Sequence, residues 1–380
     1  MRVLRTLLLV IGVLSLGSSS YATFYNNEKG SPLLGLINGA QSTLDVEIYT
    51  MKDQAIVQAF EVALHRGVKI RIIQEPTPYM DTSCMIFEAL DRKNDTPDCV
   101  NQKKLVADVK AAGGTYVPYN KILCGGNGLS GSCFEHGKMA IFDQTTVLLS
   151  TGNFDATSLC DMAEHPDVCN RDYSDVENAP SIIRSFETIF NNDLLAQPYD
   201  VMAILTKNGT QNKLTVSPDS MAPLVAFIRS AKKSLEIENQ YVTDATLVNE
   251  LVAAAKRGVK VTLMVSSLCR GADPTTSDVN AVAPIFKSFD SAGIKSLFFT
   301  DKITVGGNAG YLHAKTIIVD KKIAWLGSVN GSTTAITENR EFGIFFNSVA
   351  DVNALMGVME ADFSSPDAET FAQTQTCAKD

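Results

Sequence analysis

The order of hydrophobic and polar positions predicts the same run of helices and strands in both halves of the chain. In the first half it predicts a helix at 31–41, a strand at 43–49, a helix at 54–65 and a strand at 68–73. The same order returns in the second half, with helices at 222–232 and 244–256 and strands at 234–241 and 259–265. Strands that alternate with helices favour a largely parallel sheet covered on both faces.

A second pattern predicts one β-hairpin in each half. Apolar segments at 138–142 and 147–150 flank a polar turn at 143–146. Segments at 316–319 and 323–326 flank a turn at 320–322. The halves also share sequence, since His65-Arg66-Gly67-Val68-Lys69 matches Lys256-Arg257-Gly258-Val259-Lys260 at an offset of 191 residues. Internal repetition of this length predicts two similar lobes, at 23–200 and 201–380.

Residues 1–22 are interpreted as a secretory signal peptide. Arg2 and Arg5 precede the apolar run Leu7 to Leu16, and Ser20-Tyr21-Ala22 has the small-x-small form of a cleavage site. We therefore expect cleavage near Ala22 and a secreted or periplasmic protein. The apolar run is short for a bilayer-spanning helix, which makes a retained anchor the weaker alternative.

Eight cysteines follow this segment, an even number in a compartment that permits disulfides. Connectivity does not follow from sequence, and pairing of neighbours is the simplest assumption: Cys84–Cys99, Cys124–Cys133 and Cys160–Cys169, with Cys269 and Cys377 left to pair. No Cys-x-x-Cys segment indicates a zinc site.

The net charge of the chain argues against a polyanionic partner. It is −9, and becomes −11 without Arg2 and Arg5. An acidic protein gains nothing from general electrostatics when it approaches nucleic acid, although a local basic groove remains compatible with that charge.

Candidate chemistry lies at the start of the two hairpins. His136, Lys138, Asp143 and Asn153 follow one another at the same spacing as His313, Lys315, Asp320 and Asn330. The chain has four histidines, and two of them occupy this repeated pattern. Alternate residues of a strand point to the same face, so each His projects together with the Lys two positions later. Two imidazoles and two ammonium groups suit a phosphodiester, whose transition state gains negative charge.

The doubled pattern resembles the His-x-Lys-x4-Asp signature of the phospholipase D superfamily, followed by that family's Gly-Ser-x-Asn segment. The second copy matches fully through Gly327-Ser328-Val329-Asn330, whereas the first has Ser150-Thr151-Gly152-Asn153. The resemblance implies an α/β, phospholipase D-like fold. We therefore expect two lobes about a pseudo-twofold axis, mixed sheets flanked by helices, and one active site shared between the lobes.

The resemblance also assigns roles to residues. It favours His136 as the nucleophile that forms a phosphohistidine and His313 as the acid that protonates the leaving group, although the symmetry of the sequence leaves this order open. The downstream segments Asn170-Arg171-Asp172 and Asn339-Arg340-Glu341 run parallel. In the family, this acid often orients the His of the partner half, which gives Asp172 and Glu341 that role.

The remaining signature residues receive supporting roles. The catalytic set implied by the signature is His136, Lys138, Asp143, His313, Lys315 and Asp320. Asp143 and Asp320 fall at the hairpin turns, where a structural role binding backbone or Lys is expected. The residues expected to bind substrate or support the site are Asn153, Asn330, Thr151, Ser328, Asp172 and Glu341. No metal and no cofactor are needed for the chemistry, while calcium-assisted membrane binding stays open.

The superfamily includes phospholipases, phosphatidyltransferases and nucleases, so the substrate needs separate evidence. Ile237-Glu238-Asn239-Gln240-Tyr241 resembles a strand of phospholipases D proper. A nuclease needs stacking aromatics among basic residues, but the chain has one Trp and no Lys/Arg run of five. We expect a secreted, monomeric phospholipase D that hydrolyses glycerophospholipids at a membrane surface to phosphatidate and free headgroup. Transphosphatidylation, a secreted nuclease and a lipid-binding module with a relic site remain the alternatives.

Overall fold

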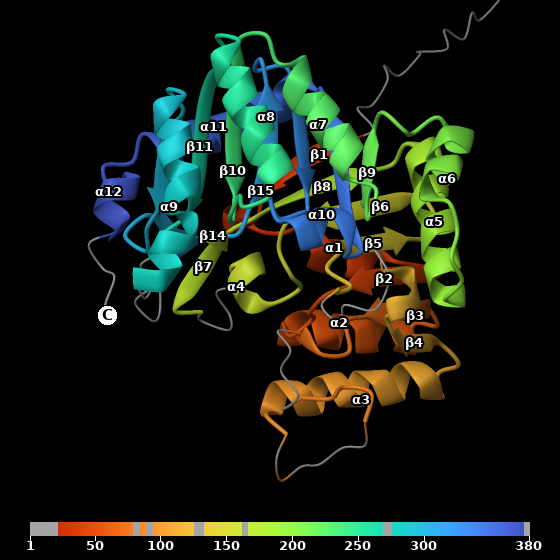
Figure 1. The fold of residues 1–380 in the computed structure, drawn as a ribbon. Coiled ribbons are helices and arrows are strands. Elements are labelled where there is room, and N and C mark those ends of the chain that lie inside the picture. Colours follow the sequence, from red (N-terminus) through yellow and green to blue (C-terminus); the bar gives the residue numbers. More distant parts are fainter. Residues whose placement is uncertain are drawn as a thin grey trace, which may run out of the picture.

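The computed structural model describes residues 22–78, 84–88, 93, 95–124, 133–161, 166–268 and 276–375. Its backbone forms two seven-stranded sheets with helices on their faces, together with a small three-stranded sheet (Figure 1). The proposed signal segment therefore lies outside the described residues, apart from Ala22, which is the first residue of strand β1.

The first sheet is built from the first half of the chain. Its strand order is β1-β8-β6-β5-β2-β3-β4. The strands are β1 (Ala22–Asn26), β2 (Thr43–Ile48), β3 (Lys69–Gln74), β4 (Thr115–Pro118), β5 (Lys138–Phe142), β6 (Thr146–Ser150) and β8 (Tyr173–Glu177). Only the β2–β3 and β3–β4 pairings are parallel, and the other four are antiparallel.

The second sheet repeats this arrangement with strands from the second half. Its order is β12-β11-β10-β15-β16-β17-β9. The strands are β9 (Leu214–Ser217), β10 (Ser234–Asn239), β11 (Lys260–Ser266), β12 (Lys295–Phe299), β15 (Lys315–Val319), β16 (Ile323–Gly327) and β17 (Glu341–Phe346). Here too the β10–β11 and β11–β12 pairings are parallel and the rest antiparallel. The expected mixed sheets are confirmed, whereas a largely parallel sheet is wrong, because the hairpins insert antiparallel strands.

Helices cover both faces of each sheet. On the first sheet, α1 (Leu33–Gly39), α2 (Gln54–His65) and α3 (Pro97–Ala111) bury one apolar face, and α5 (Pro180–Leu195) and α6 (Val201–Asn208) bury the other. On the second sheet, α7 (Met221–Ser230), α8 (Ala245–Lys256) and α9 (Thr276–Ser291) cover one face, and α11 (Val349–Phe363) covers the opposite one. The boundary between residues 200 and 201, which lies between α5 and α6, stays a prediction.

Segments from the two halves meet directly at the centre of the molecule. The small sheet contains β13 (Thr304–Val305), β14 (Asn308–Leu312) and β7 (Val168–Arg171), with β14 parallel to β7. This pairing brings the segment before His313 beside the segment before Asp172. An isolated parallel bridge between Glu135 and Arg340 does the same for His136 and Glu341. Short helices α4 (Ala156–Leu159) and α10 (Thr333–Thr337) follow β6 and β16, and α12 (Phe371–Thr374) lies near the C-terminus.

The cysteines follow the neighbour-pairing assumption in part. Cys84 is joined to Cys99, and Cys124 to Cys133. The expected Cys160–Cys169 disulfide is contradicted, because both residues are buried free thiols. The Cys160 thiol contacts the Cys169 side chain without a covalent bond, and it lies 3.8 Å from the Thr157 carbonyl oxygen. Cys269 and Cys377 lie outside the described residues.

Candidate active site

The two histidines occupy equivalent places just before the first strand of each hairpin. His136 lies two residues before the start of β5, and its backbone N–H donates to the carbonyl of Arg340 at 2.9 Å. His313 lies two residues before the start of β15, and its N–H donates to the carbonyl of Arg171 at 3.3 Å. Each histidine is therefore fixed by backbone from the other half of the chain.

Each imidazole also contacts a carboxyl group from the opposite half. His136 Nδ1 lies 2.9 Å from Glu341 Oε2. His313 Nδ1 lies 3.0 Å from Asp172 Oδ1 and 3.1 Å from Oδ2. This crosswise contact leaves the Nε2 atom of each ring as the one available for chemistry.

Glycine is required where these groups approach the backbone. A Cβ on Gly137 would lie 2.5 Å from the Phe342 ring and 2.6 Å from Glu135 Oε1. A Cβ on Gly152 would overlap the Asp172 carboxylate. Gly152, which stands at the variable position of the Gly-Ser-x-Asn segment, therefore leaves the room that Asp172 needs beside His313.

The two lysines lie buried beside the histidines. Lys138 Nζ donates to the carbonyl of His136 at 2.5 Å and lies 5.2 Å from the centre of the Tyr49 ring. Lys315 Nζ donates to the carbonyl of Thr151 at 3.3 Å and to that of His313. Burial lowers the pKa of Lys138 to about 8 and that of Lys315 to about 7. An anionic phosphate between them would favour their charged forms.

Burial favours the neutral form of both histidines, and more strongly for His136 than for His313. Burial lowers the pKa of His136 well below its usual range, and the charges of Lys138, Lys315 and His313 add to this effect. Burial also lowers the pKa of His313, against the opposing effect of Asp172. A neutral imidazole has one nitrogen lone pair, which a nucleophile or a base requires.

The two acids differ although their positions are equivalent. Burial raises the pKa of Glu341 to about 8, partly offset by Lys138. Burial acts in the same direction on Asp172, but His313, Lys315 and Thr151 outweigh it and the pKa falls below its ordinary value. Charge is therefore more firmly fixed on the Asp172 side, and the site is electrostatically asymmetric.

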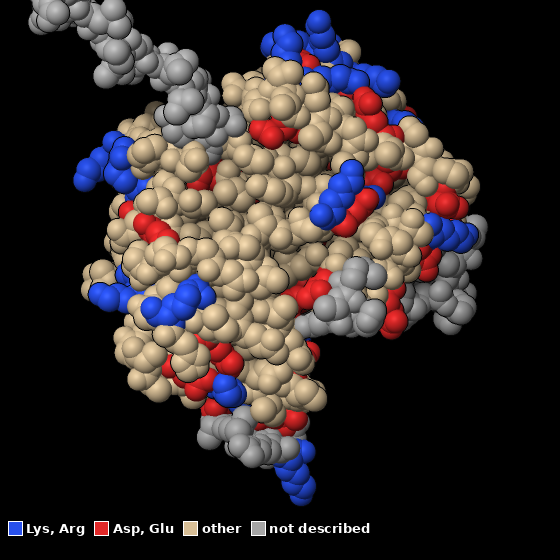
Figure 2. Space-filling view, turned by 180° about the vertical axis from the view of Figure 1, so that it is seen from behind, with Lys and Arg blue, Asp and Glu red and all other residues tan. Residues whose placement is uncertain are grey.

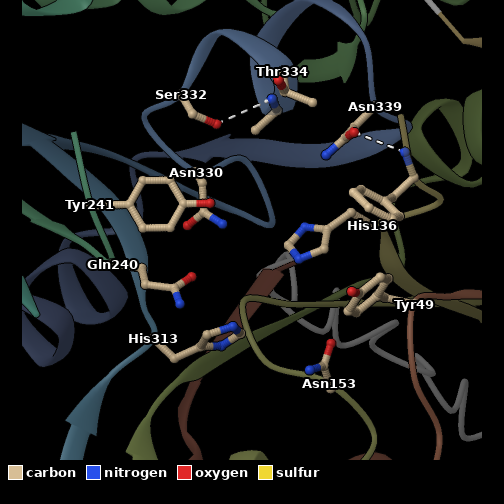
Figure 3. Close-up of a pocket in the computed structure, with 12 residues that line it drawn as sticks. Tyr49, His136, Asn153, Gln240, Tyr241, His313, Asn330, Ser332, Thr334 and Asn339 are labelled. Atoms are coloured by element: carbon tan, nitrogen blue, oxygen red, sulfur yellow. Dashed lines mark hydrogen bonds between the residues drawn. The ribbon is translucent and has the colours of Figure 1, made fainter. Parts of the chain in front are cut away.

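Both histidines open into one cavity of about 540 Å³ between the halves. Figure 3 shows the two rings projecting into it from different segments, with the amide side chains and Tyr49 and Tyr241 around them. The lining residues are Tyr49, Phe134, His136, Asn153, Gln240, Tyr241, His313, Asn330, Ser332, Thr334, Ala335 and Asn339. The volume is sufficient for a phosphodiester and a small alcohol.

The structure divides the expected supporting residues into two groups. Asn153 and Asn330 line the cavity. The hydroxyls expected to help bind the phosphate contact the acids' segments instead: Thr151 Oγ1 donates to Asp172 Oδ1 at 2.6 Å, and Ser328 Oγ accepts from the Phe342 N–H at 3.0 Å. Thr151 and Ser328 thus hold the segments that carry the acids.

Asp143 and Asp320 lie at the far ends of β5 and β15, so their inclusion in the catalytic set is corrected. Asp143 accepts hydrogen bonds from the backbone N–H groups of Gln41, Ser42 and Thr43 at 2.6–3.1 Å. Asp320 accepts from residues 232–234 at 2.7–3.1 Å. Each lies five residues beyond the lysine that begins its strand, roughly 16 Å at 3.3 Å per residue. Their role is to fix the hairpin turn to the start of the neighbouring strand.

Several lining residues were missed by sequence reasoning. Tyr49 and Gln240 are equivalent under the 191-residue offset, which was a usable signal. Ser332, Thr334 and Asn339 come from the loop and short helix α10 after the second hairpin. Within the described part of the chain, no group of three or more His, Cys, Asp or Glu side chains is suited to hold a metal ion.

Curated relatives match part of the chain. A cardiolipin synthase of Clostridium perfringens is 30% identical over 155 residues, which are 40% of this chain and 28% of that enzyme. The major cardiolipin synthase ClsA of Bacillus subtilis is 25% identical over 139 residues, 36% of this chain and 26% of that enzyme. The chain thus matches only about a quarter of the length of these relatives.

Solved structures share the fold over most of the chain. Phosphatidylserine synthase of Haemophilus influenzae aligns with a TM-score of 0.61 at 13% identity, covering 94% of this chain and 89% of that one. Polyphosphate kinase of Porphyromonas gingivalis aligns with a TM-score of 0.58 at 14% identity, covering 91% and 50%. At these identities the likeness concerns the fold alone.

The expected secreted or periplasmic location is contradicted by the curated relatives. They are named as synthases of cardiolipin, a membrane phospholipid, and not as exported hydrolases. We therefore withdraw that location. Among the described residues, no helix has the length and apolar character needed to cross a membrane.

A family model described as "Cardiolipin synthase, PLD-like domain" matches residues 33–194 and 224–365, one copy in each half. These segments cover most of the chain and include both histidines, both lysines and both acids. Enzymes of this group catalyse their reaction without a metal or other cofactor. The chain belongs to the phospholipase D superfamily and carries two cardiolipin synthase-type, phospholipase D-like domains that share one site.

Proposed function

We propose that this protein transfers the phosphatidyl group of a glycerophospholipid to an alcohol through a covalent phosphohistidine, with water as the competing acceptor. The observation that carries this proposal is the crosswise arrangement of two histidines, each bound at Nδ1 by an acid of the other half, around one cavity. The family model and the cardiolipin synthases among the relatives support a phosphodiester enzyme that acts on phospholipids.

In the first step His136 Nε2 attacks phosphorus and the bond from phosphorus to the headgroup oxygen breaks. His313, whose protonated form the Asp172 carboxylate favours, carries a proton on Nε2 in this step and gives it to the departing alkoxide. The electron pair of the broken bond leaves with the headgroup oxygen. Glu341 stabilises the positive charge that develops on His136, because its Oε2 atom accepts a hydrogen bond from the Nδ1–H group.

In the second step neutral His313 removes the proton of the acceptor hydroxyl. The acceptor oxygen attacks phosphorus, and the bond between phosphorus and His136 Nε2 breaks. Asp172 holds the His313 ring in the required tautomer in both steps. The enzyme returns to its starting protonation state, with His136 neutral and His313 protonated at Nε2.

Lys138 and Lys315 supply the charge that the pentacoordinate transition state needs. Both are buried next to the histidines, and charge–charge interactions are stronger there than in water. The amides of Asn153 and Asn330, on equivalent loops that line the cavity, are suited to donate to the phosphate oxygens.

The cavity lining favours a neutral, hydroxylated headgroup or acceptor. Apart from the two histidines, the side chains around it are amides, hydroxyls, aromatic rings and one alanine. None of these described lining residues is a carboxylate that would match an ammonium headgroup. Glycerol-type alcohols fit this set, and the cardiolipin synthases among the relatives support transfer to such an alcohol over hydrolysis alone.

Nucleic acid is the weaker substrate class. The chain carries a net charge of −9. On the face shown in Figure 2, acidic and basic side chains are interspersed and form no continuous basic band. A polyanion bound without sequence preference needs such a band.

The monomeric state expected from the internal repeat remains a prediction.

The test incubates purified protein with phosphatidylglycerol vesicles, phosphatidylcholine vesicles and plasmid DNA, with His136→Ala as the control. We expect a diphosphatidyl product and free glycerol from phosphatidylglycerol, little turnover of phosphatidylcholine, and no nicking of DNA. Phosphatidate as the only lipid product would reduce the proposal to hydrolysis. If the protein nicks DNA, turns over no lipid and loses the nicking in His136→Ala, the proposed phosphatidyl transfer would be replaced by a nuclease activity.

A further inference from the structure

Two buried arginines lie directly beside the acids of the site. Arg171 precedes Asp172, and Arg340 precedes Glu341. Their exposed fractions are 5% and 2%. Neither lines the cavity, so neither has a part in the chemistry described above.

Each guanidinium reaches an aspartate on a helix of the other half. Arg171 Nε and one terminal nitrogen donate to the two carboxylate oxygens of Asp362, on α11, at 2.8 and 2.9 Å. Arg340 donates to Asp193, on α5, at 2.9 Å. The paired, planar contact of Arg171 with Asp362 fixes orientation as well as distance, whereas Arg340 makes one hydrogen bond to Asp193. We name these two pairs the arginine clamps.

The backbone of the same arginines holds the histidines. The Arg340 carbonyl accepts from the His136 N–H at 2.9 Å, and the Arg171 carbonyl accepts from the His313 N–H at 3.3 Å. One residue therefore contacts both partners of each catalytic pair: the acid is its chain neighbour, and the backbone N–H of the histidine donates to its carbonyl. A shift of the arginine would change the distance between imidazole and carboxylate.

An ion pair that only stabilises the fold would not need this placement. The chain offers such a pair for comparison in Arg71 and Asp45, on adjacent strands β3 and β2 of one half. Its contacts are also paired, at 2.6 and 2.5 Å, and Asp45 is 2% exposed. Neither Arg71 nor Asp45 adjoins the site. The pair therefore shares the two-bond contact of Arg171 with Asp362 but not its place beside a catalytic acid.

We propose that Asp193 and Asp362 are positioning residues that act through Arg340 and Arg171 to keep each histidine aligned with the acid of the opposite half. The proposal rests on the proposed function, since it concerns the same site. It assigns control of the chemical step to two aspartates that lie outside the cavity.

The test compares Asp362→Asn with the control Asp45→Asn. Asparagine keeps the shape but loses the second acceptor that the guanidinium uses. We expect Asp362→Asn to lower kcat about 100-fold, the loss typical of a misalignment near 1 Å, with KM unchanged within twofold. Asp45→Asn should lower the melting temperature to a similar extent and leave kcat unchanged.

A double variant separates positioning from general damage. If Asp362 acts through the His313–Asp172 pair, Asp172→Asn combined with Asp362→Asn should be no slower than Asp172→Asn alone. Losses that multiply in the double variant, or equal loss of kcat in Asp362→Asn and Asp45→Asn, would overturn the proposal.

Activity on bis(p-nitrophenyl) phosphate keeps this test independent of the lipid. If the wild type hydrolyses that diester but no phospholipid, the proposed function fails, while the effect of Asp362→Asn on kcat can still be measured with the diester. A second readout needs no activity: the proton on His313 Nδ1 should give a downfield imidazole signal in ¹⁵N-histidine NMR spectra. We expect Asp362→Asn to lose it and Asp45→Asn to keep it; retention in folded Asp362→Asn would contradict the inference.

Discussion

The contact between His136 and Glu341 allows one substitution to be worked out in detail. Glu341 Oε2 faces His136 Nδ1, while Oε1 accepts from Asn339 Nδ2 at 3.1 Å. The Asn339 amide is itself fixed, because its oxygen accepts from the Phe134 N–H at 2.9 Å. In Glu341→Gln the new amide oxygen should therefore stay with Asn339, and its NH₂ group should face His136.

That arrangement reverses the tautomer of the imidazole. With an N–H donor opposite Nδ1, the ring accepts there and carries its proton on Nε2, where the nucleophilic lone pair is needed. The corresponding inversion in a serine protease triad lowers kcat by about 10⁴. At about 1.4 kcal/mol per tenfold, this corresponds to about 5.5 kcal/mol of lost transition-state stabilisation. KM should change little, since no cavity-lining group is removed.

The assay measures initial rates of Glu341→Gln on phosphatidylglycerol vesicles and on a soluble chromogenic diester. Glu236→Gln serves as the control, because this carboxyl on β10 is also largely buried and binds Ser234 Oγ, away from the site. Both variants should keep the wild-type circular dichroism spectrum. A loss of kcat below about tenfold in Glu341→Gln would refute the tautomer argument and the role given to His136.

Three further predictions concern charge, the hairpin turns and metals. Burial lowers the pKa of Lys138 to about 8 and of Lys315 to about 7, so both ammonium groups lose their charge as the pH rises. Because these charges bind the phosphate, KM for a soluble diester should increase from pH 6 to pH 9. A KM that does not change over this range would contradict the prediction. Asp320→Ala should lower the free energy of unfolding by about 1–2 kcal/mol, because it removes backbone hydrogen bonds at residues 232–234, while kcat of the folded fraction stays unchanged in a denaturation and activity series. Chelation with EDTA should leave soluble diester turnover intact, since the lysines supply the positive charge, whereas added calcium should alter only binding to vesicles in a sedimentation assay.

Local pattern predicted individual elements well. The helix expected at 54–65 is α2 with the same bounds, because its apolar spacing, the Asp53 cap and Gly67 all act within the segment. The strand order could not be predicted in this way. The antiparallel pairing of β2 with β5 joins residues about 95 positions apart, and alternation within one strand carries no information on its neighbours.

The site was predictable where the sequence repeats. Both histidines and both lysines stand at the same spacing, both acids follow in parallel Asn-Arg-acid segments, and the structure brings these six residues together. The hydrogen-bond partners of the Thr151 and Ser328 hydroxyls were not predictable, because they depend on how closely the segments that carry the acids approach these hydroxyls. Ser332 and Thr334 reach the cavity through the turn that follows β16, and among the described residues of the first half no counterpart of either lines it.

The exchange of partners between the halves has a consequence for any attempt to divide the protein. Each half holds one imidazole and the carboxylate meant for the other, so an isolated half would contain two mismatched components and no working couple. Separately expressed fragments cut within 209–213 should be inert alone and regain turnover only on mixing. Fusion into one polypeptide also frees the two sides to diverge, and aspartate on one side with glutamate on the other is such a divergence.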